Sequence, residues 1–171
     1  MLKFSAALLC AALSLPGQPL ASQSLSGRRA PSFSLPDSKL QQHDILDYRG
    51  RWLLLDFMYT ACPHCKELSK TLEGVMTRHG GKVAVLSIVV PPDNIASVTK
   101  YIAEVKITSP IVFDSSQVAI PYFKATPQTQ GFDTPHLFAI DPNGMIVRDW
   151  GQAAVEAPGF LNELEQVLNK K

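Results

Sequence analysis

Two long runs of apolar residues stand out in an otherwise mixed pattern of hydrophobic and polar positions. They are Trp52 to Met58 (WLLLDFM) and Val83 to Val90 (VAVLSIVV). Continuous runs of this length are typical of strands that are covered on both faces, and the β-branched residues of the second run favour a central parallel strand. Pro91 and Pro92 end that second run.

Helical spacing appears between the two runs and again after the second one. The first set of apolar positions follows Pro63 and ends before Gly80 and Gly81; it comprises Leu68, Leu72, Val75 and Met76. The second set follows Asp93, which is placed to cap a helix; it comprises Ile95, Val98, Ile102 and Val105. Each set lies on one face of a helix, so the pattern predicts two amphipathic helices.

The last third of the chain predicts a short strand, an insert, a hairpin and a final helix. The strand is Ile111–Phe113, and a short helical segment is expected around Ser115–Phe123. HLFAI and MIVRDW flank the turn sequence DPNG (141–144), which indicates an antiparallel hairpin. The final helix is indicated by apolar positions at helical spacing: Phe160, Leu161, Leu164, Val167 and Leu168.

The order of these elements predicts an α/β fold with a central mixed sheet flanked by helices. The segment from Leu25 to Arg51 is polar and interrupted by prolines, and it is expected to form an arm with a small β-hairpin. Strands that alternate with helices favour right-handed crossovers and a sheet covered on both faces. The sequence shows no repeat and no linker, so one domain is expected.

The N-terminal segment has the features of a signal peptide. After Lys3 comes the uncharged, largely apolar stretch FSAALLCAALSL, which is shorter than the roughly 20 residues that span a bilayer. Cleavage near Ala21 is expected, so that residues 1–21 form the signal peptide and residues 22–171 the domain. The alternative is an uncleaved membrane anchor. Export to a periplasmic or other extracytoplasmic compartment is predicted in both cases.

Charge and composition exclude some function classes. The 171 residues carry a net charge of +1 and are 46% hydrophobic, which is ordinary for a globular protein. A protein that binds nucleic acid would need a basic surface, and this balance offers none. We expect a monomer with no nucleic-acid partner.

Candidate chemistry lies in Cys62-Pro63-His64-Cys65, where the first apolar run meets its helix. Once Cys10 is removed with the leader, these two cysteines can pair only with each other. A bridge over two residues closes too short a loop to stabilise a fold, so a redox role is favoured over a structural one. The helix N-terminus favours the thiolate of Cys62 as the attacking group, and Cys65, one turn later, is placed to resolve a mixed disulfide.

Other residues near this motif are assigned supporting roles. His64 is expected to stabilise the Cys62 thiolate and so to make the pair more oxidising, while Pro63 fits the first helical turn. Asp56 is a carboxylate within an apolar strand; burial is favoured over a position where the strand frays, and a buried Asp56 could accept a proton from Cys65 through a water molecule. Pro135, preceded by Thr134, is either a simple start of a strand or a cis proline.

A family resemblance follows from several motifs in order. The segments APSFSLPDSKL, ILDYRGRWLLLDFMYTACPHC and DTPHLFAIDPNGMIVRDWG together resemble the thioredoxin superfamily, in particular its exported TlpA and ResA-like branch. The resemblance covers nearly all of the chain from Ala30. It implies a cis Pro135 packed against the cysteine pair, a Thr134 backbone that binds an extended substrate peptide, and an α/β insert from Ile107 to Lys124.

The resemblance also implies the activity and the partners. The implied activity is that of a thiol–disulfide oxidoreductase with no cofactor beyond the redox-active pair. The implied partners are protein thiols or disulfides as substrates and a redox-recycling partner, for which a membrane protein is one option. Pro-His between the cysteines is the dipeptide of strongly oxidising DsbA proteins. A reductant for cytochrome c maturation and a general periplasmic exchanger therefore both stay open.

Two rival functions are weighed against this interpretation. In a Sco-like copper protein, Cys62 and Cys65 would bind metal together with His64 or His136, but that branch has three residues between its cysteines, and strand alternation should turn His136 away if Pro135 faces the pair. No metal is therefore expected. A peroxiredoxin-type peroxidase would need a Pro-x-x-x-Thr-x-x-Cys arrangement, and Thr60 lies only two residues before Cys62.

Overall fold

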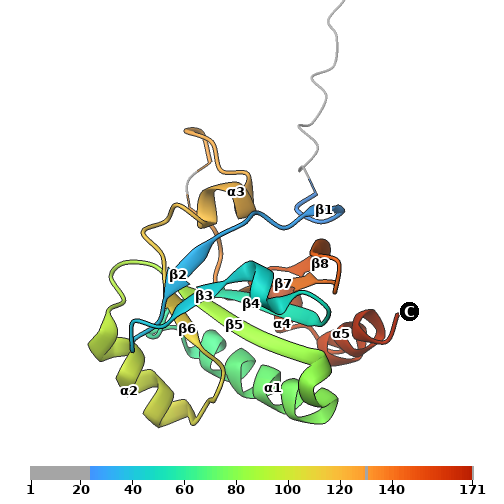
Figure 1. Cartoon of the computed structure of the whole chain (residues 1–171), viewed down its shortest axis with the longest axis horizontal. Coiled ribbons are helices and arrows are strands. Elements are labelled where there is room, and N and C mark those ends of the chain that lie inside the picture. The colour runs from blue at the N-terminus through green and yellow to red at the C-terminus, as the bar shows by residue number, and fades with distance from the viewer. Residues whose placement is uncertain (1–23, 130, 171) are drawn as a thin grey trace, which may run out of the picture.

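A six-stranded mixed sheet forms the centre of the computed structural model, which describes residues 24–129 and 131–170 (Figure 1). The strand order is β1-β8-β7-β4-β5-β6, with β4 parallel to β5 and antiparallel to β7. The strands are β1 (Arg28–Arg29), β4 (Trp52–Met58), β5 (Val83–Val89), β6 (Ile111–Phe113), β7 (His136–Ile140) and β8 (Met145–Trp150). The predicted mixed sheet is confirmed.

Side chains alternate between the two faces of this sheet, and both faces are buried. Leu54, Val85 and Leu137 point to one face, where helices α1 (Pro63–His79), α2 (Ile95–Val105) and α5 (Phe160–Leu168) supply the packing partners. Leu55 and Phe138 point to the other face, which the N-terminal arm and α3 (Ala119–Phe123) cover. In Figure 1, α1 and α2 lie below the sheet and α3 lies above it. The near-continuous apolar runs exist because each strand is covered twice.

Helix α1 follows β4 directly and begins where the sequence analysis expects it. Cys62 is its N-cap and Pro63 its first residue, a position at which a proline loses no intrahelical hydrogen bond. Leu68, Leu72 and Val75 are buried against the sheet. The helix ends at Gly80, whose φ of 57° is a conformation that glycine adopts without strain.

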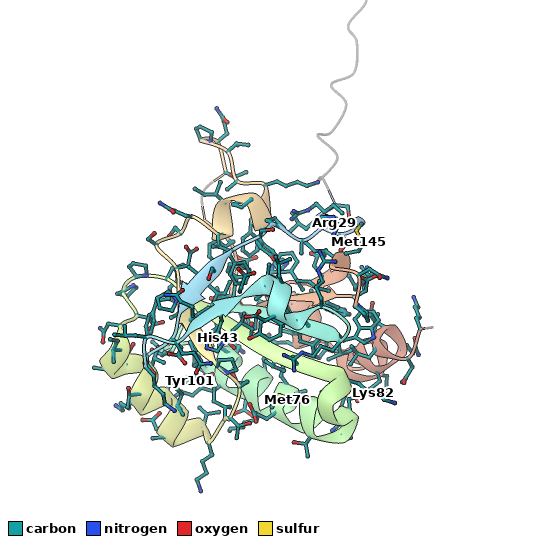
Figure 2. The ribbon with its side chains drawn as sticks, viewed as in Figure 1. Arg29, His43, Met76, Lys82, Tyr101 and Met145 are labelled. Carbon is teal, nitrogen blue, oxygen red and sulfur yellow. The ribbon has the colours of Figure 1, made fainter. Side chains whose placement is uncertain are left out.

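The N-terminal arm forms the expected hairpin and also reaches both edges of the main sheet. Strands β2 (Ser34–Pro36) and β3 (Gln42–Asp44) pair, and the 3₁₀ helix η1 (Ile45–Tyr48) follows. The short strand β1, which the sequence analysis missed, pairs with β8, and Figure 2 shows Arg29 beside its partner Met145. At the other edge, Asp37 bridges Val112 of β6.

Helix α2 departs in two details from the expected pattern. Its N-cap is Asn94, whose side chain accepts from the backbone N–H of Ala96 and Ser97, so the prediction that Asp93 caps this helix is wrong. Ile95 is 52% exposed, whereas Tyr101 is 2% exposed and takes the central place on the buried face beside Val98. The helical phase directs the side chain of Tyr101 inward, where its hydroxyl forms a hydrogen bond of 2.8 Å with Ser69 Oγ.

The C-terminal elements agree with the sequence pattern, with one addition. The 141–144 turn joins β7 to β8, and α5 packs on the α1 side of the sheet through Phe160, Leu164, Val167 and Leu168. The short helix α4 (Gln152–Val155), between β8 and α5, was not predicted. The proposed signal peptide or anchor at residues 1–21 lies outside the described residues. Within the described part, no helix combines the length and hydrophobicity needed to cross a membrane.

Candidate active site

The cysteine pair lies at the carboxyl end of β4, where α1 begins. The Cys62 side chain accepts a hydrogen bond from the Cys65 backbone N–H at 3.1 Å, which makes this sulfur the cap of the helix. N–H groups at a helix N-terminus have no intrahelical acceptor, and together with the helix dipole they favour a negative charge on the capping atom. The geometry of α1 therefore directs the Cys65 backbone N–H and the positive end of the helix dipole at the Cys62 sulfur.

The two thiols differ in exposure, as the division of roles requires. Both are free; Cys62 is half-buried, and Cys65 is fully buried beside Met58 and Val89. Burial raises the pKa of the Cys65 thiol, and its contacts with Cys62 and with the charge of Asp56 raise it further. Cys65 therefore stays protonated at neutral pH and needs a base before it can attack a disulfide.

Thr134 and Pro135 lie against the sulfur of Cys62. The peptide bond between them is cis, which confirms the expectation drawn from the family resemblance, and Pro135 is buried. The carbonyl oxygen of Thr134 is 3.9 Å from Cys62 Sγ. The structure thus brings together the motif and a loop that lies far along the sequence, and it leaves the Thr134 backbone beside the reactive atom.

Asp56 is buried beneath the pair, as favoured from the sequence. Its side chain is inaccessible to solvent, and both carboxylate oxygens lack a hydrogen-bond partner among the described residues. Its register neighbours are Ser87 on β5 and Leu137 on β7. Burial alone raises the pKa of Asp56 to about 8. A carboxyl group that titrates near neutral pH can both accept and return a proton, which suits it to act as a general base toward Cys65.

A second buried polar contact lies on the same side of the sheet. Ser69, one turn beyond Cys65 on α1, bonds Tyr101 of α2 at 2.8 Å, and Figure 2 shows Tyr101 on that helix. Burial raises the pKa of the Tyr101 hydroxyl, so it remains neutral. The bond fixes α2 to α1 one turn from the reactive thiols. No sequence pattern indicates this pair, because the apolar spacing that predicts α2 does not include the tyrosine.

His64 points to an acidic partner on another element. Its Nδ1 lies 2.9 Å from Oε1 of Glu156, which follows α4, and the side chains are 51% and 42% exposed. The imidazole is thus in the first turn of α1, as expected, but it forms an ion pair that was not predicted. Glu156 lies far away in the sequence and carries no motif, so only the fold reveals the contact.

The loop between β4 and α1 is anchored by Asp93. One carboxylate oxygen of Asp93 accepts from the Thr60 backbone N–H at 2.9 Å, and the other accepts from the Thr60 hydroxyl. Ser97 Oγ donates to the same carboxylate at 2.8 Å. Asp93 therefore links the start of α2 to the segment just before Cys62. This role replaces the capping role that was predicted for it.

The histidines do not gather around the cysteine pair. His136 lies on the face opposite to α1, with Nε2 3.1 Å from Asp149 and its ring against Phe123, as strand alternation predicted. His43 pairs with Asp37 and His79 with Glu165, and both histidines are half-buried. Among residues 24–129 and 131–170, no group of three or more His, Cys, Asp or Glu side chains is placed to hold a metal ion.

Fold and site together define a class: proteins with a thioredoxin-like fold that carry a helix-capping cysteine, a buried second cysteine and a cis proline beside them. Comparison with known proteins is consistent with this class. Residues 26–149 match the AhpC/TSA family, and the chain belongs to that family.

Among curated relatives, the chain is similar to the thiol-disulfide oxidoreductase ResA of Geobacillus kaustophilus (strain HTA426). The two are 28% identical over 123 residues, which cover 70% of this chain and 66% of the relative. Solved structures with the same fold include a thiol-disulfide oxidoreductase from Bacteroides fragilis NCTC 9343, with a TM-score of 0.64, 23% identity and coverage of 82% of this chain and 100% of that one. BsSco, a member of the Sco family of cytochrome c oxidase assembly proteins, has a TM-score of 0.66, 18% identity and coverage of 83% and 93%.

Proposed function

We propose that this chain is an exported thiol–disulfide oxidoreductase that exchanges disulfides with the thiols of other proteins. The observation that carries the proposal is the placement of Cys62, half-buried at the N-cap of α1, with a buried Cys65 one turn behind it. The Thr134 carbonyl and cis Pro135 beside Cys62 Sγ support it. The curated relatives that bear the name ResA support the same activity.

In the reducing direction, the Cys62 thiolate attacks one sulfur of a substrate disulfide. The substrate S–S bond breaks, a mixed disulfide forms, and the first substrate sulfur leaves as a thiolate. The backbone of Thr134 binds the extended substrate segment in the manner of an added strand, which holds the target sulfur near Cys62.

Resolution of the mixed disulfide needs the second cysteine. Asp56 accepts the proton of Cys65 through a bridging water, and the Cys65 thiolate then attacks Cys62 Sγ. A Cys62–Cys65 disulfide forms, the second substrate sulfur leaves, and two electrons have passed to the substrate. A redox-recycling partner then restores the dithiol. The oxidising direction is the same sequence in reverse.

Two variants test this mechanism. Cys62→Ser should abolish reduction of a disulfide-bonded test protein, whereas Cys65→Ser should retain the attack and accumulate a mixed disulfide that is visible on non-reducing gels. Turnover by Cys62→Ser at the parent's rate would refute the mechanism. Peroxide consumption measured on the same samples tests the peroxidase alternative, and a copper titration of the reduced protein tests the Sco-like one.

Direction of electron flow and export need their own measurements. A reduction potential of about −270 mV would favour a reductant, such as one for cytochrome c maturation, and a potential of about −120 mV would favour an oxidant.

Export is supported by the apolar segment after Lys3. Mass determination of the protein recovered from outside the cytoplasm would show whether cleavage occurs near Ala21 or whether the segment is kept as an anchor.

A further inference from the structure

Glu156 is held in place by its own short helix. Its backbone N–H donates to the Gln152 carbonyl at 3.1 Å, and its Oε1 accepts from the Gln152 side-chain amide at 2.9 Å. The same Oε1 lies 2.9 Å from Nδ1 of His64. The ion pair thus joins the junction of α4 and α5 to the first turn of α1, with the carboxylate fixed from one side by Gln152.

Glu156 is the acidic group that contacts His64 directly. The groove beside the start of α1 is also lined by Glu67 of the same helix, but Glu67 is paired with Lys70, whose Nζ lies 2.8 Å from its Oε1. The basic Lys66 is engaged elsewhere, with Nζ 2.9 Å from Glu104 of α2. A protonated His64 is therefore neutralised by Glu156 and does not act as an isolated positive charge two residues from Cys62.

We propose that Glu156 is a positioning residue that sets the redox potential of the cysteine pair through His64. The inference rests on the proposed oxidoreductase function and adds a residue to it. A positive charge near Cys62 stabilises the thiolate, hence the dithiol form, and makes the pair more oxidising. Glu156 opposes this effect of the Pro-His dipeptide, because its negative charge compensates the imidazolium.

The direction of the change in redox potential follows from the net charge of the His64–Glu156 pair. Removal of the Glu156 carboxylate raises the net charge beside Cys62 by one and leaves a positive His64 uncompensated. The measurement is made at pH 5.5, where imidazole side chains in general carry a positive charge. Both side chains are about half exposed, so solvent screening keeps the effect modest.

The experiment measures the reduction potential of the full protein against a dithiol redox buffer at pH 5.5. Glu156→Gln should favour the reduced form by about threefold, or about 14 mV at 29.6 mV per decade. The rate at which iodoacetamide alkylates Cys62 should rise at low pH in the same variant. In a His64→Gln background, Glu156→Gln should have a smaller effect, because without the imidazole the exposed carboxylate is no longer held against the first turn of α1 and is screened by solvent.

Glu104→Gln is the matched control. It removes one carboxylate from an ion pair of the same 2.9 Å length on the first turn of α1, and it should shift the potential less than Glu156→Gln does, because its partner Lys66 does not lie between the two cysteines. The inference is overturned if Glu156→Gln has the parent's potential, or if the shift is as large in the His64→Gln background. A parent protein that does not equilibrate with the redox buffer at all would instead refute the proposed oxidoreductase function.

Discussion

Replacement of Asp56 by asparagine should stabilise the protein in a strongly pH-dependent way. The substitution keeps the size of the side chain and removes its charge. The folded-state pKa of Asp56 is about 8, against an ordinary value of 3.8. Between these two values the folded protein binds more protons than the unfolded chain, so the free energy of unfolding of the parent falls as the pH rises from about 4 to about 8.

The magnitude follows from the same two values. At about 1.36 kcal/mol per pKa unit, the interval from 3.8 to about 8 corresponds to an upper bound of about 6 kcal/mol, fully present above pH 8. Relaxation and water entry on ionisation reduce this figure. Urea denaturation of both reduced proteins between pH 4 and pH 9 measures it, and the difference in free energy between variant and parent should grow steadily with pH.

Parallel pH profiles for Asp56→Asn and the parent would refute the argument. Asp114→Asn is the matched control: Asp114 is also buried, but its carboxylate accepts three backbone N–H bonds at the start of α3. Its replacement should lower stability without removing the fall with rising pH. In turnover assays, Asp56→Asn should slow resolution of the mixed disulfide by about 100-fold, since general-base catalysis typically contributes that much or more.

Three further substitutions test the packing around the site. Asp93→Ala removes the acceptor of the Thr60 N–H and hydroxyl and should cost about 1–3 kcal/mol, measured as a lower urea midpoint. Leu72→Ala, on the buried face of α1 at a side chain that is 1% exposed, should lower the free energy of unfolding by about 2–5 kcal/mol, measured in a thermal unfolding scan. Gly144→Ala should cost about 1–2 kcal/mol by urea denaturation, because φ is 80° and the new Cβ would lie 2.7 Å from Arg49 Cζ. Wild-type stability in any of these variants would contradict the corresponding contact.

The sequence predicted the elements that are fixed by local pattern. The apolar runs of β4 and β5 and the 141–144 turn are set by burial and turn chemistry, which short stretches of sequence record. The capping role predicted for Asp93 is wrong because aspartate and the adjacent Asn94 are both good helix caps. Only the position of Thr60, which bonds Asp93 in the folded protein, shows which of the two residues caps α2.

The candidate site was predictable only in part, for a related reason. The helix-capping place of Cys62 and the burial of Asp56 follow from the strand–helix junction, which is local. The Glu156 contact to His64 depends on where the junction of α4 and α5 comes to lie, and no short-range pattern encodes that position.

The two edge strands of the central sheet are short, and this bears on the proposed exchange of disulfides with other proteins. One edge strand is the two-residue β1, and the other is the three-residue β6, to which Asp37 forms a β-bridge. Long unpaired strands would offer backbone N–H and carbonyl groups to any extended polypeptide and so promote self-association and aggregation. With both edge strands this short, the backbone of Thr134 is the place at which the proposed function expects an extended substrate segment to add as a strand.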